Sequence, residues 1–121
     1  MKIEKRREVL EVVDADLANS TYHDVNMSGT RIDMCNLSRL AIAHGNLAGM
    51  SFEDCGMSGS SFRNINLAGS RFDDVNMSSV VIENANLSGM RISKSCKIDG
   101  LYIDGVLATE LLAAWRSAKN D

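Results

Sequence analysis

The 121-residue sequence has no proline, few aromatic residues and no long apolar run. Aromatic side chains make up 5% of the residues although 45% are hydrophobic, so aliphatic side chains must fill most of any core. No stretch of 18 apolar residues is present, which argues against a membrane-spanning helix. Residues 1–14 are charged and lack the apolar segment of a secretory signal, so we expect a cytoplasmic protein with no membrane partner.

The cysteine spacing and the net charge argue against disulfide-rich, zinc-binding and nucleic-acid-binding proteins. Three cysteines without a CxxC pair predict neither a disulfide framework nor a zinc site. The net charge is −3, from 13 basic and 16 acidic residues, and no segment is basic enough to predict direct nucleic-acid binding. No nucleotide or phosphate fingerprint is present, so no cofactor is expected.

The sequence does contain a large apolar residue at every fifth position. Sixteen positions in a row, each five residues after the last, are occupied by a large apolar residue from Leu17 to Ile92. The residue two positions before each of them is never charged, whereas the other three positions are mostly polar or small. Neither a helix, with a period of 3.6, nor a strand, with a period of 2, explains this spacing. Two side chains in every five are therefore expected to point inward.

Several pentads resemble the A-(D/N)-L-x-x motif of the pentapeptide-repeat family: ADLAN (15–19), GNLAG (45–49), INLAG (65–69) and ANLSG (85–89). The resemblance covers roughly residues 10–105. It implies an all-β solenoid, a right-handed quadrilateral β-helix of about four to five coils with four pentads in each coil. Stacking at about 4.8 Å per coil would bury continuous columns of side chains, which a single pentad cannot do alone.

Wrapping the sequence at four pentads per coil aligns chemically similar positions. Asn26, Asn46, Asn66 and Asn86 form one column, and we expect their side chains to hydrogen-bond from coil to coil. Another column contains Gly29, Gly49, Gly69 and Gly89. These glycines suit a corner that requires a positive φ.

The register breaks once, at Lys97, where an apolar residue is due. One extra residue there would recentre the next two pentads on Ile98 and Ile103. A helix is expected from Thr109 or Glu110 to Ala118, with Thr109 as its N-cap. The chain then divides into a lead-in (1–9), a β-helix (10–105) and a helix with a tail (106–121), all within one domain. In the lead-in, the segment KIEKRR is expected to be frayed or loosely helical.

The predicted helix carries the candidate interface residues Leu111, Leu112 and Trp115. An open solenoid leaves unpaired backbone at its ends. These three side chains would therefore either cap their own last coil or form a homodimer through this end, as the family resemblance implies for several members. Tryptophan is enriched at interfaces, which slightly favours the dimer.

The acidic residues Glu53, Asp54, Asp73 and Asp74 are expected to lie together, one coil apart. A solvated wall compensated by arginines is the simplest interpretation, and an acidic patch for a basic partner is the alternative. Catalysis by paired carboxylates would need a cleft that desolvates one of them, and a convex wall offers none.

The histidines and the inner cysteines form two smaller groups. His23, Asp24 and His44 should lie close together; two histidines and an acid could hold a surface metal ion, although ordinary exposed side chains are the simpler interpretation. Cys35 and Cys55 share an inner column, where free thiols act as small hydrophobic groups. We therefore expect no catalytic, cofactor or metal site.

The sequence favours a non-enzymatic structural or protein–protein interaction module whose partner is unidentified. The resemblance also implies an alternative, a DNA-mimic protein that binds DNA gyrase or topoisomerase and modulates quinolone sensitivity. Three features depart from that alternative: the repeat is short, no loop interrupts the coils, and the net charge of −3 is modest.

Overall fold

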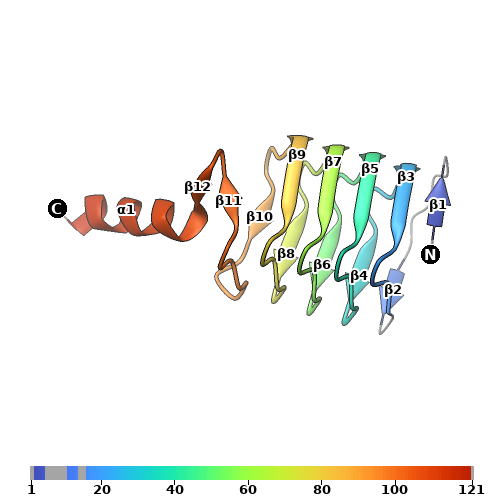
Figure 1. The fold of residues 1–121 in the computed structure, drawn as a ribbon, viewed down its shortest axis with the longest axis horizontal. Helices are drawn as coiled ribbons and strands as arrows, with labels where there is room; N and C mark the ends of the chain where they lie inside the picture. Colours follow the sequence, from blue (N-terminus) through green and yellow to red (C-terminus); the bar gives the residue numbers. More distant parts are fainter. Residues whose placement is uncertain (1, 5–10, 14–15, 121) are drawn as a thin grey trace.

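The structure, a computed structural model, describes residues 2–4, 11–13 and 16–120. It is a β-solenoid of about four turns with a helix at its C-terminal end (Figure 1). One five-stranded parallel sheet contains, in order, β1 (Lys2–Glu4), β3 (Thr21–Asn26), β5 (Ala41–Asn46), β7 (Ser61–Asn66) and β9 (Val81–Asn86). The other contains β2 (Glu11–Val13), β4 (Arg31–Asp33), β6 (Ser51–Glu53), β8 (Arg71–Asp73) and β10 (Arg91–Ile92).

Successive strands from β3 to β9 pair in a constant register of four pentads, which confirms the predicted coil length. Tyr22 pairs with Ile42, and Ile42 pairs with Phe62. Outside the named strands, single parallel bridges join Asp16, Asn36, Gly56 and Asn76 in series. Backbone hydrogen bonds such as Met27 N–H to the Asn46 carbonyl (2.8 Å) connect the coils at another wall. Every wall therefore repeats the same backbone pairing.

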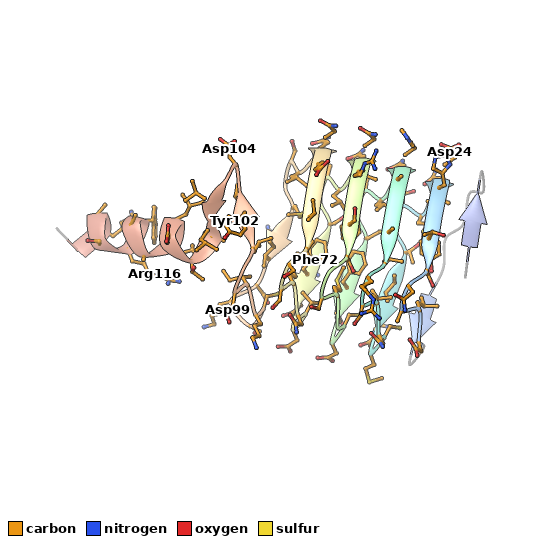
Figure 2. The ribbon with its side chains drawn as sticks, viewed as in Figure 1. Asp24, Phe72, Asp99, Tyr102, Asp104 and Arg116 are labelled. Atoms are coloured by element: carbon orange, nitrogen blue, oxygen red, sulfur yellow. The ribbon has the colours of Figure 1, made fainter. Side chains whose placement is uncertain are left out.

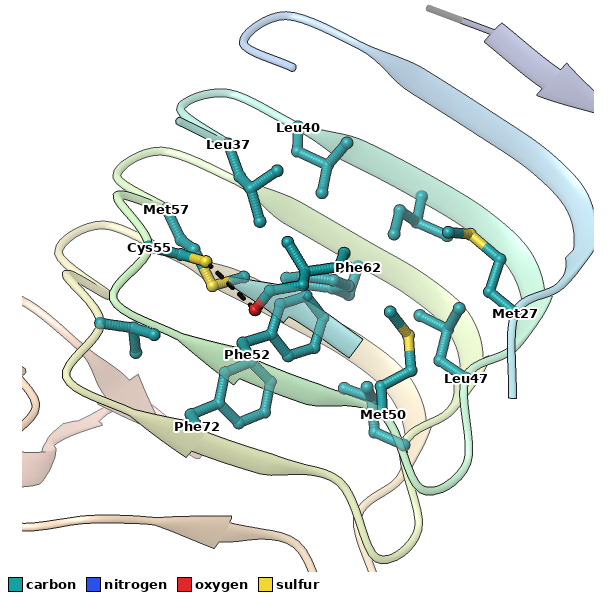
Figure 3. Close-up of a cluster of buried hydrophobic side chains, with 14 of the residues drawn as sticks. Met27, Leu37, Leu40, Leu47, Met50, Phe52, Cys55, Met57, Phe62 and Phe72 are labelled. Atoms are coloured by element: carbon teal, nitrogen blue, oxygen red, sulfur yellow. Dashed lines mark hydrogen bonds between the residues drawn. The ribbon is translucent and has the colours of Figure 1, made fainter. Parts of the chain in front are cut away.

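The predicted inner positions form the core (Figure 3). Residues of the pentad centres are almost fully buried from Tyr22 to Met77. The rings of Phe52 and Phe72 stack with centroids 4.7 Å apart and planes only 4° from parallel. Small neighbours leave room for the rings: Ser60 and Ser70 are buried beside Phe62 and Phe72, each two positions before its ring. The alternation of small and large side chains thus gives a filled interior.

The asparagine columns act differently from the prediction. The Asn26 side chain accepts a hydrogen bond from the Ser28 backbone N–H (3.1 Å), and Asn66 accepts one from Ala68 N–H (2.9 Å). Each amide therefore closes an Asx turn within its own coil, and no coil-to-coil amide bond is found among these described asparagines. The expectation of an amide ladder was wrong because the turn supplies a nearer donor.

The N-terminal lead-in also differs from the expectation. Lys2–Glu4 is not helical but forms β1, which lies parallel to β3 with Ile3 opposite Tyr22. The chain between these partners is one residue shorter than the chain between Val12 and Ile32, which pair with the regular offset of one coil. Strand β1 thus extends the first sheet by one strand.

The predicted register break near Lys97 is confirmed. Arg91 pairs with Arg71 at the regular offset of one coil, whereas the offset between Lys97 and its partner Asn76 contains one extra residue. The pentad expected at Ile103 does not continue the solenoid. Strand β11 (Tyr102–Ile103) instead pairs antiparallel with β12 (Val106–Leu107), and the side chain that returns to the interior is Leu101, which is 6% exposed.

Helix α1 spans Ala108–Asn120 and is longer than predicted. It begins one residue earlier, so Thr109 lies inside its first turn and is not the N-cap. Glu110 lies in the first turn and Lys119 in the last, where each charge complements the helix dipole. Within the described ranges, no helix has the length and apolar character needed to cross a membrane.

Two glycines provide a matched test of the backbone. Gly69 has a φ of +71°, whereas the φ of Gly56 is not left-handed. In its column, Gly56 lies between Asn36 and Asn76. A Cβ at either position would meet no atom within 4 Å. We expect Gly69→Ala to lower the free energy of unfolding by about 1–2 kcal/mol because of the left-handed backbone. Gly56→Asn should raise it by about 1 kcal/mol by restricting the unfolded chain and restoring an Asx turn. Urea denaturation measures both; equal effects would contradict this account.

A second matched pair tests the buried hydroxyl groups. The Ser70 hydroxyl donates to the Leu47 carbonyl at 2.8 Å and accepts from Met50 N–H at 3.2 Å. Thr30 occupies the same column two coils earlier, and its buried Oγ1 has no hydrogen-bond partner among the described atoms. Thr30→Val should therefore raise the free energy of unfolding by about 1 kcal/mol, whereas Ser70→Ala should lower it by about 1–2 kcal/mol. Loss of stability in Thr30→Val would show that its hydroxyl is satisfied.

Candidate functional site

The C-terminal end of the solenoid is uncovered. Helix α1 extends along the long axis away from the coils (Figure 1), and every residue from Thr109 to Lys119 is exposed. The last coil shows the effect of this absence of cover. Leu87 is 42% exposed, whereas Leu67, its equivalent one coil earlier, is fully buried. Within the described residues, the helix therefore leaves the last coil partly open to solvent.

Most of the exposed large hydrophobic residues gather at this end. We call this set the terminal apolar surface: Val81, Leu87, Tyr102, Ile103, Val106, Leu111, Leu112 and Trp115. Tyr102 and Trp115 have the largest exposed fractions, 62% and 60%. Lys119 Nζ lies 5.3 Å from the centre of the Trp115 ring, a cation–π distance. The three candidate interface residues are thus accompanied by other exposed apolar residues from the last coil and the hairpin.

A hollow of about 560 Å³ lies between the last coil and the start of α1. Its floor and walls are mainly apolar and include Ile92, Ile98, Leu101, Leu111 and Leu112. Two cationic side chains, Lys94 and Arg116, also line it, and Figure 2 shows Arg116 on the helix. The hollow can therefore accept a bulky apolar side chain.

The hairpin that shapes this end was missed in the sequence, although a signal for it was present. Asp104 and Gly105 form the two-residue loop between β11 and β12, with φ values of +51° and +79°. An Asp-Gly pair with positive φ at both positions is typical of a tight hairpin turn. The five-residue period hid this signal because the segment LYIDG also fits a pentad.

The four predicted acidic residues come together on the wall formed by β4, β6, β8 and β10, which we call the charged wall. Glu53 pairs in register with Asp73, and Asp54 and Asp74 follow them at corners that have the same φ of +51°. All four are at least partly exposed. The pattern therefore has the stacking that the sequence predicted, on an exposed surface.

Cations accompany the acids on the charged wall. Arg31 Nη2 lies 2.8 Å from Asp33 Oδ2 and 3.7 Å from Glu53 Oε2. The Ser93 hydroxyl donates to Asp73 Oδ1 at 2.8 Å. At the C-terminal end of the wall, Arg91 pairs in register with Arg71. The wall is therefore of mixed charge, and exposed ion pairs of this kind contribute little to stability.

The two histidines lie in contact on neighbouring strands. The rings of His23 and His44 have centroids 5.1 Å apart and planes 77° from parallel. His23 Nδ1 lies 3.2 Å from Asp24 Oδ2, and these two side chains are 50% and 40% exposed. Among the residues that the structure describes, no group of three or more His, Cys, Asp and Glu side chains is arranged to hold a metal ion.

The cysteines are free thiols. Cys35 and Cys55 are buried in one column, as predicted, and Cys55 Sγ donates to the Glu53 carbonyl at 3.1 Å. Burial raises the pKa of the Cys55 thiol above its ordinary value, so this group stays protonated and unreactive at neutral pH. Cys96 is partly exposed and lines the terminal hollow. The two inner cysteines therefore serve the core.

Comparisons with known proteins agree with this geometry. A family model described as pentapeptide repeats matches residues 51–89 in eight copies. A pentapeptide-repeat protein, Rfr23, from the cyanobacterium Cyanothece has a similar structure: the TM-score is 0.54 at 12% identity, over 78% of this chain and 89% of that one. At this identity the similarity shows the fold alone.

Two other solved structures match with lower scores. A trypsin-treated form of QnrB1, a plasmid-mediated fluoroquinolone resistance protein, has a TM-score of 0.38 at 16% identity, over 74% of this chain and 58% of that one. HetL, from the cyanobacterium Nostoc and involved in heterocyst differentiation regulation, has a TM-score of 0.36 at 17% identity, over 88% of this chain and 53% of that one. No curated protein matches the sequence significantly. Residues 51–89 thus match the pentapeptide-repeat model, and the same five-residue period and stacked coils continue on both sides of this range.

Proposed function

We propose that this protein is a non-enzymatic protein-interaction module that forms a homodimer through its C-terminal end. The observation that carries the proposal is the terminal apolar surface, which the last coil, the β11–β12 hairpin and α1 leave open to solvent. The four acidic residues of the charged wall support a non-enzymatic role because they lie on an exposed wall, without the desolvated cleft that acid–base chemistry needs. A cytoplasmic location stays a prediction, supported by the free thiols.

The exposure of the terminal apolar surface supports a protein partner. Its eight large residues are each 39–62% exposed. Large contiguous apolar patches are rare on monomeric proteins and mark interaction sites. Exposed apolar residues of this number can supply the core of an interface, before any polar rim is counted.

The composition of this surface favours a second copy as the partner. Interfaces between identical subunits are more apolar than other interfaces, and a two-fold contact uses the same patch on both copies. Trp115 is the only tryptophan of the chain, and it belongs to the same helix as Leu111 and Leu112, which line the hollow. A large aromatic side chain near an apolar hollow of suitable size is a self-complementary arrangement. In the dimer, each protomer would fill the hollow of the other.

The proposal predicts a concentration-dependent dimer that depends on Trp115. Sedimentation velocity should show a dimer for the parent protein, and Trp115→Ala should shift the population to monomer because it removes the largest apolar contact. Met34→Ala is the matched control: Met34 is 53% exposed but follows β4 on the charged wall, away from this end. The emission of the single tryptophan should also move to longer wavelength on dilution.

A monomer for the parent protein at all accessible concentrations would refute the dimer. An equal loss of dimer in Trp115→Ala and Met34→Ala would place the interface elsewhere. Circular dichroism is the control for folding. We expect both variants to keep the spectrum of the parent protein, because both side chains are largely exposed.

Gyrase binding by DNA mimicry is the alternative, and the clustered carboxylates of the charged wall are the feature that favours it. The magnitude of the charge favours it less. Residues 16–90 carry eight acids and four arginines. That net charge of −4 is spread over roughly 18 Å of stacked coils. Duplex DNA carries about 11 negative charges over the same length. Arg31, paired with Asp33, further reduces the negative field.

We therefore expect no inhibition of gyrase. The measurement is a supercoiling assay in which purified gyrase is titrated with this protein, with and without a quinolone. Inhibition or drug protection at low micromolar protein would replace our proposal, provided that it disappears when Glu53, Asp54, Asp73 and Asp74 are reversed to lysine. Inhibition that survives the reversal would implicate a different surface.

A further inference from the structure

The contact between His23 and His44 has no evident role in the fold. These are the only two histidines of the chain, and they come from neighbouring strands, β3 and β5. His44 lies at the same corner of its coil as Asp24 does one coil earlier, since Val25 pairs with Gly45. The His23 side chain is half exposed, so the contact fills no part of the core. Figure 2 shows Asp24 at the outer edge of the solenoid near its N-terminal end.

The spacing of the two rings matches that of two ligands on one metal ion. When two imidazole nitrogens bind one tetrahedral zinc at about 2.0–2.1 Å, the ring centroids lie roughly 5 Å apart. The rings of His23 and His44 are 5.1 Å apart. The rings meet edge to face, with planes 77° from parallel, so they must rotate to direct one nitrogen of each ring to a common point. Exposed side chains rotate on the picosecond-to-nanosecond timescale. The parallel pairing of β3 and β5 holds the two backbones at the required separation.

Asp24 provides the outer support that metal-binding histidines usually have. Its Oδ2 lies 3.2 Å from His23 Nδ1. A carboxylate that accepts a hydrogen bond from Nδ1–H fixes the tautomer and leaves the Nε2 lone pair available to a metal. Asp24 also contributes a negative charge beside the bound cation. This carboxylate–histidine pair therefore orients one of the two ligands before the metal arrives.

We infer from this geometry that His23 and His44 form a clamp for a divalent transition-metal ion, with Asp24 as a positioning residue. The clamp supplies two protein nitrogens, so water would fill the remaining coordination positions. Imidazole ligands select copper, nickel and zinc over magnesium and calcium. Arg63 on β7 is opposite Ala43 in the register, so this neighbouring strand carries a cationic residue.

A bound ion would connect the coils that contain β3 and β5 from outside. An ion that binds only the folded state raises the free energy of unfolding. This increase grows with the logarithm of the ratio of metal concentration to dissociation constant. The two histidines are a whole coil apart along the unfolded chain, which would therefore bind the ion more weakly. Metal binding and stability of the N-terminal coils should therefore rise together.

The test is calorimetric titration of untagged protein with zinc and with nickel, alongside thermal unfolding. We expect one equivalent of either ion to bind and to raise the unfolding temperature, whereas magnesium has no effect. His23→Ala and His44→Ala should each lower the affinity at least ten-fold. Asp24→Asn should lower it by a smaller factor, with both histidine C2–H proton resonances still responding to the metal.

Two controls separate the clamp from other sites. Asn64→Ala changes the equivalent corner one coil beyond His44 and should bind metal like the parent protein. Cys96→Ser removes the partly exposed thiol and should also leave binding unchanged. The inference is wrong if no ion binds at millimolar concentration, if one histidine variant retains full affinity, or if binding depends on Cys96.

Discussion

The parallel pairing of each residue with its equivalent one coil later is the constraint on which the rest of this molecule depends. Because four pentads make one coil, each side chain lies above its own equivalent. Tyr22, Ile42 and Phe62 thus share one column, and Phe52 stacks on Phe72. The same pairing places Glu53 opposite Asp73, and it places His44 opposite Asp24, the chain neighbour of His23. The core and the outer clusters are therefore products of a single register, and no distant part of the chain has to find them.

This dependence explains why much of the fold is readable from the sequence. The spacing of Leu17 and its successors predicts which side chains point inward, and the family resemblance implies the four-pentad coil that forms the columns and stacks the acids. Lys97 marks the point where the frame changes. The failures occur where a local interaction competes with the repeat. Asn26 bonds to the Ser28 backbone instead of the next coil, and Asp104-Gly105 closes a hairpin although its pentad looks regular. Strand β1 was missed because its offset from β3 is not a whole number of pentads.

The candidate sites were less predictable than the fold, because exposure is a property of the whole arrangement. The sequence identifies Leu111, Leu112 and Trp115 as apolar residues on a helix, but it cannot say whether the last coil covers them. The structure shows that the helix extends away and that Leu87, although placed like a core residue, is open to solvent. The terminal apolar surface is thus exposed because the helix extends away from the last coil. Arg31, by contrast, lies beside Asp33 and Glu53, which agrees with the expected wall of acids compensated by arginines.

The two-residue loop at Asp104 and Gly105 has a geometric consequence. It fixes the direction of α1, because the hairpin that it closes contains β12, the strand that contacts α1 and leads directly into it. A helix of 13 residues is about 20 Å long. A difference of about 10° in the direction of the helix would therefore displace its far end by roughly 3.5 Å. The backbone angles of two residues thus determine where the exposed side chains of the helix lie relative to the coils.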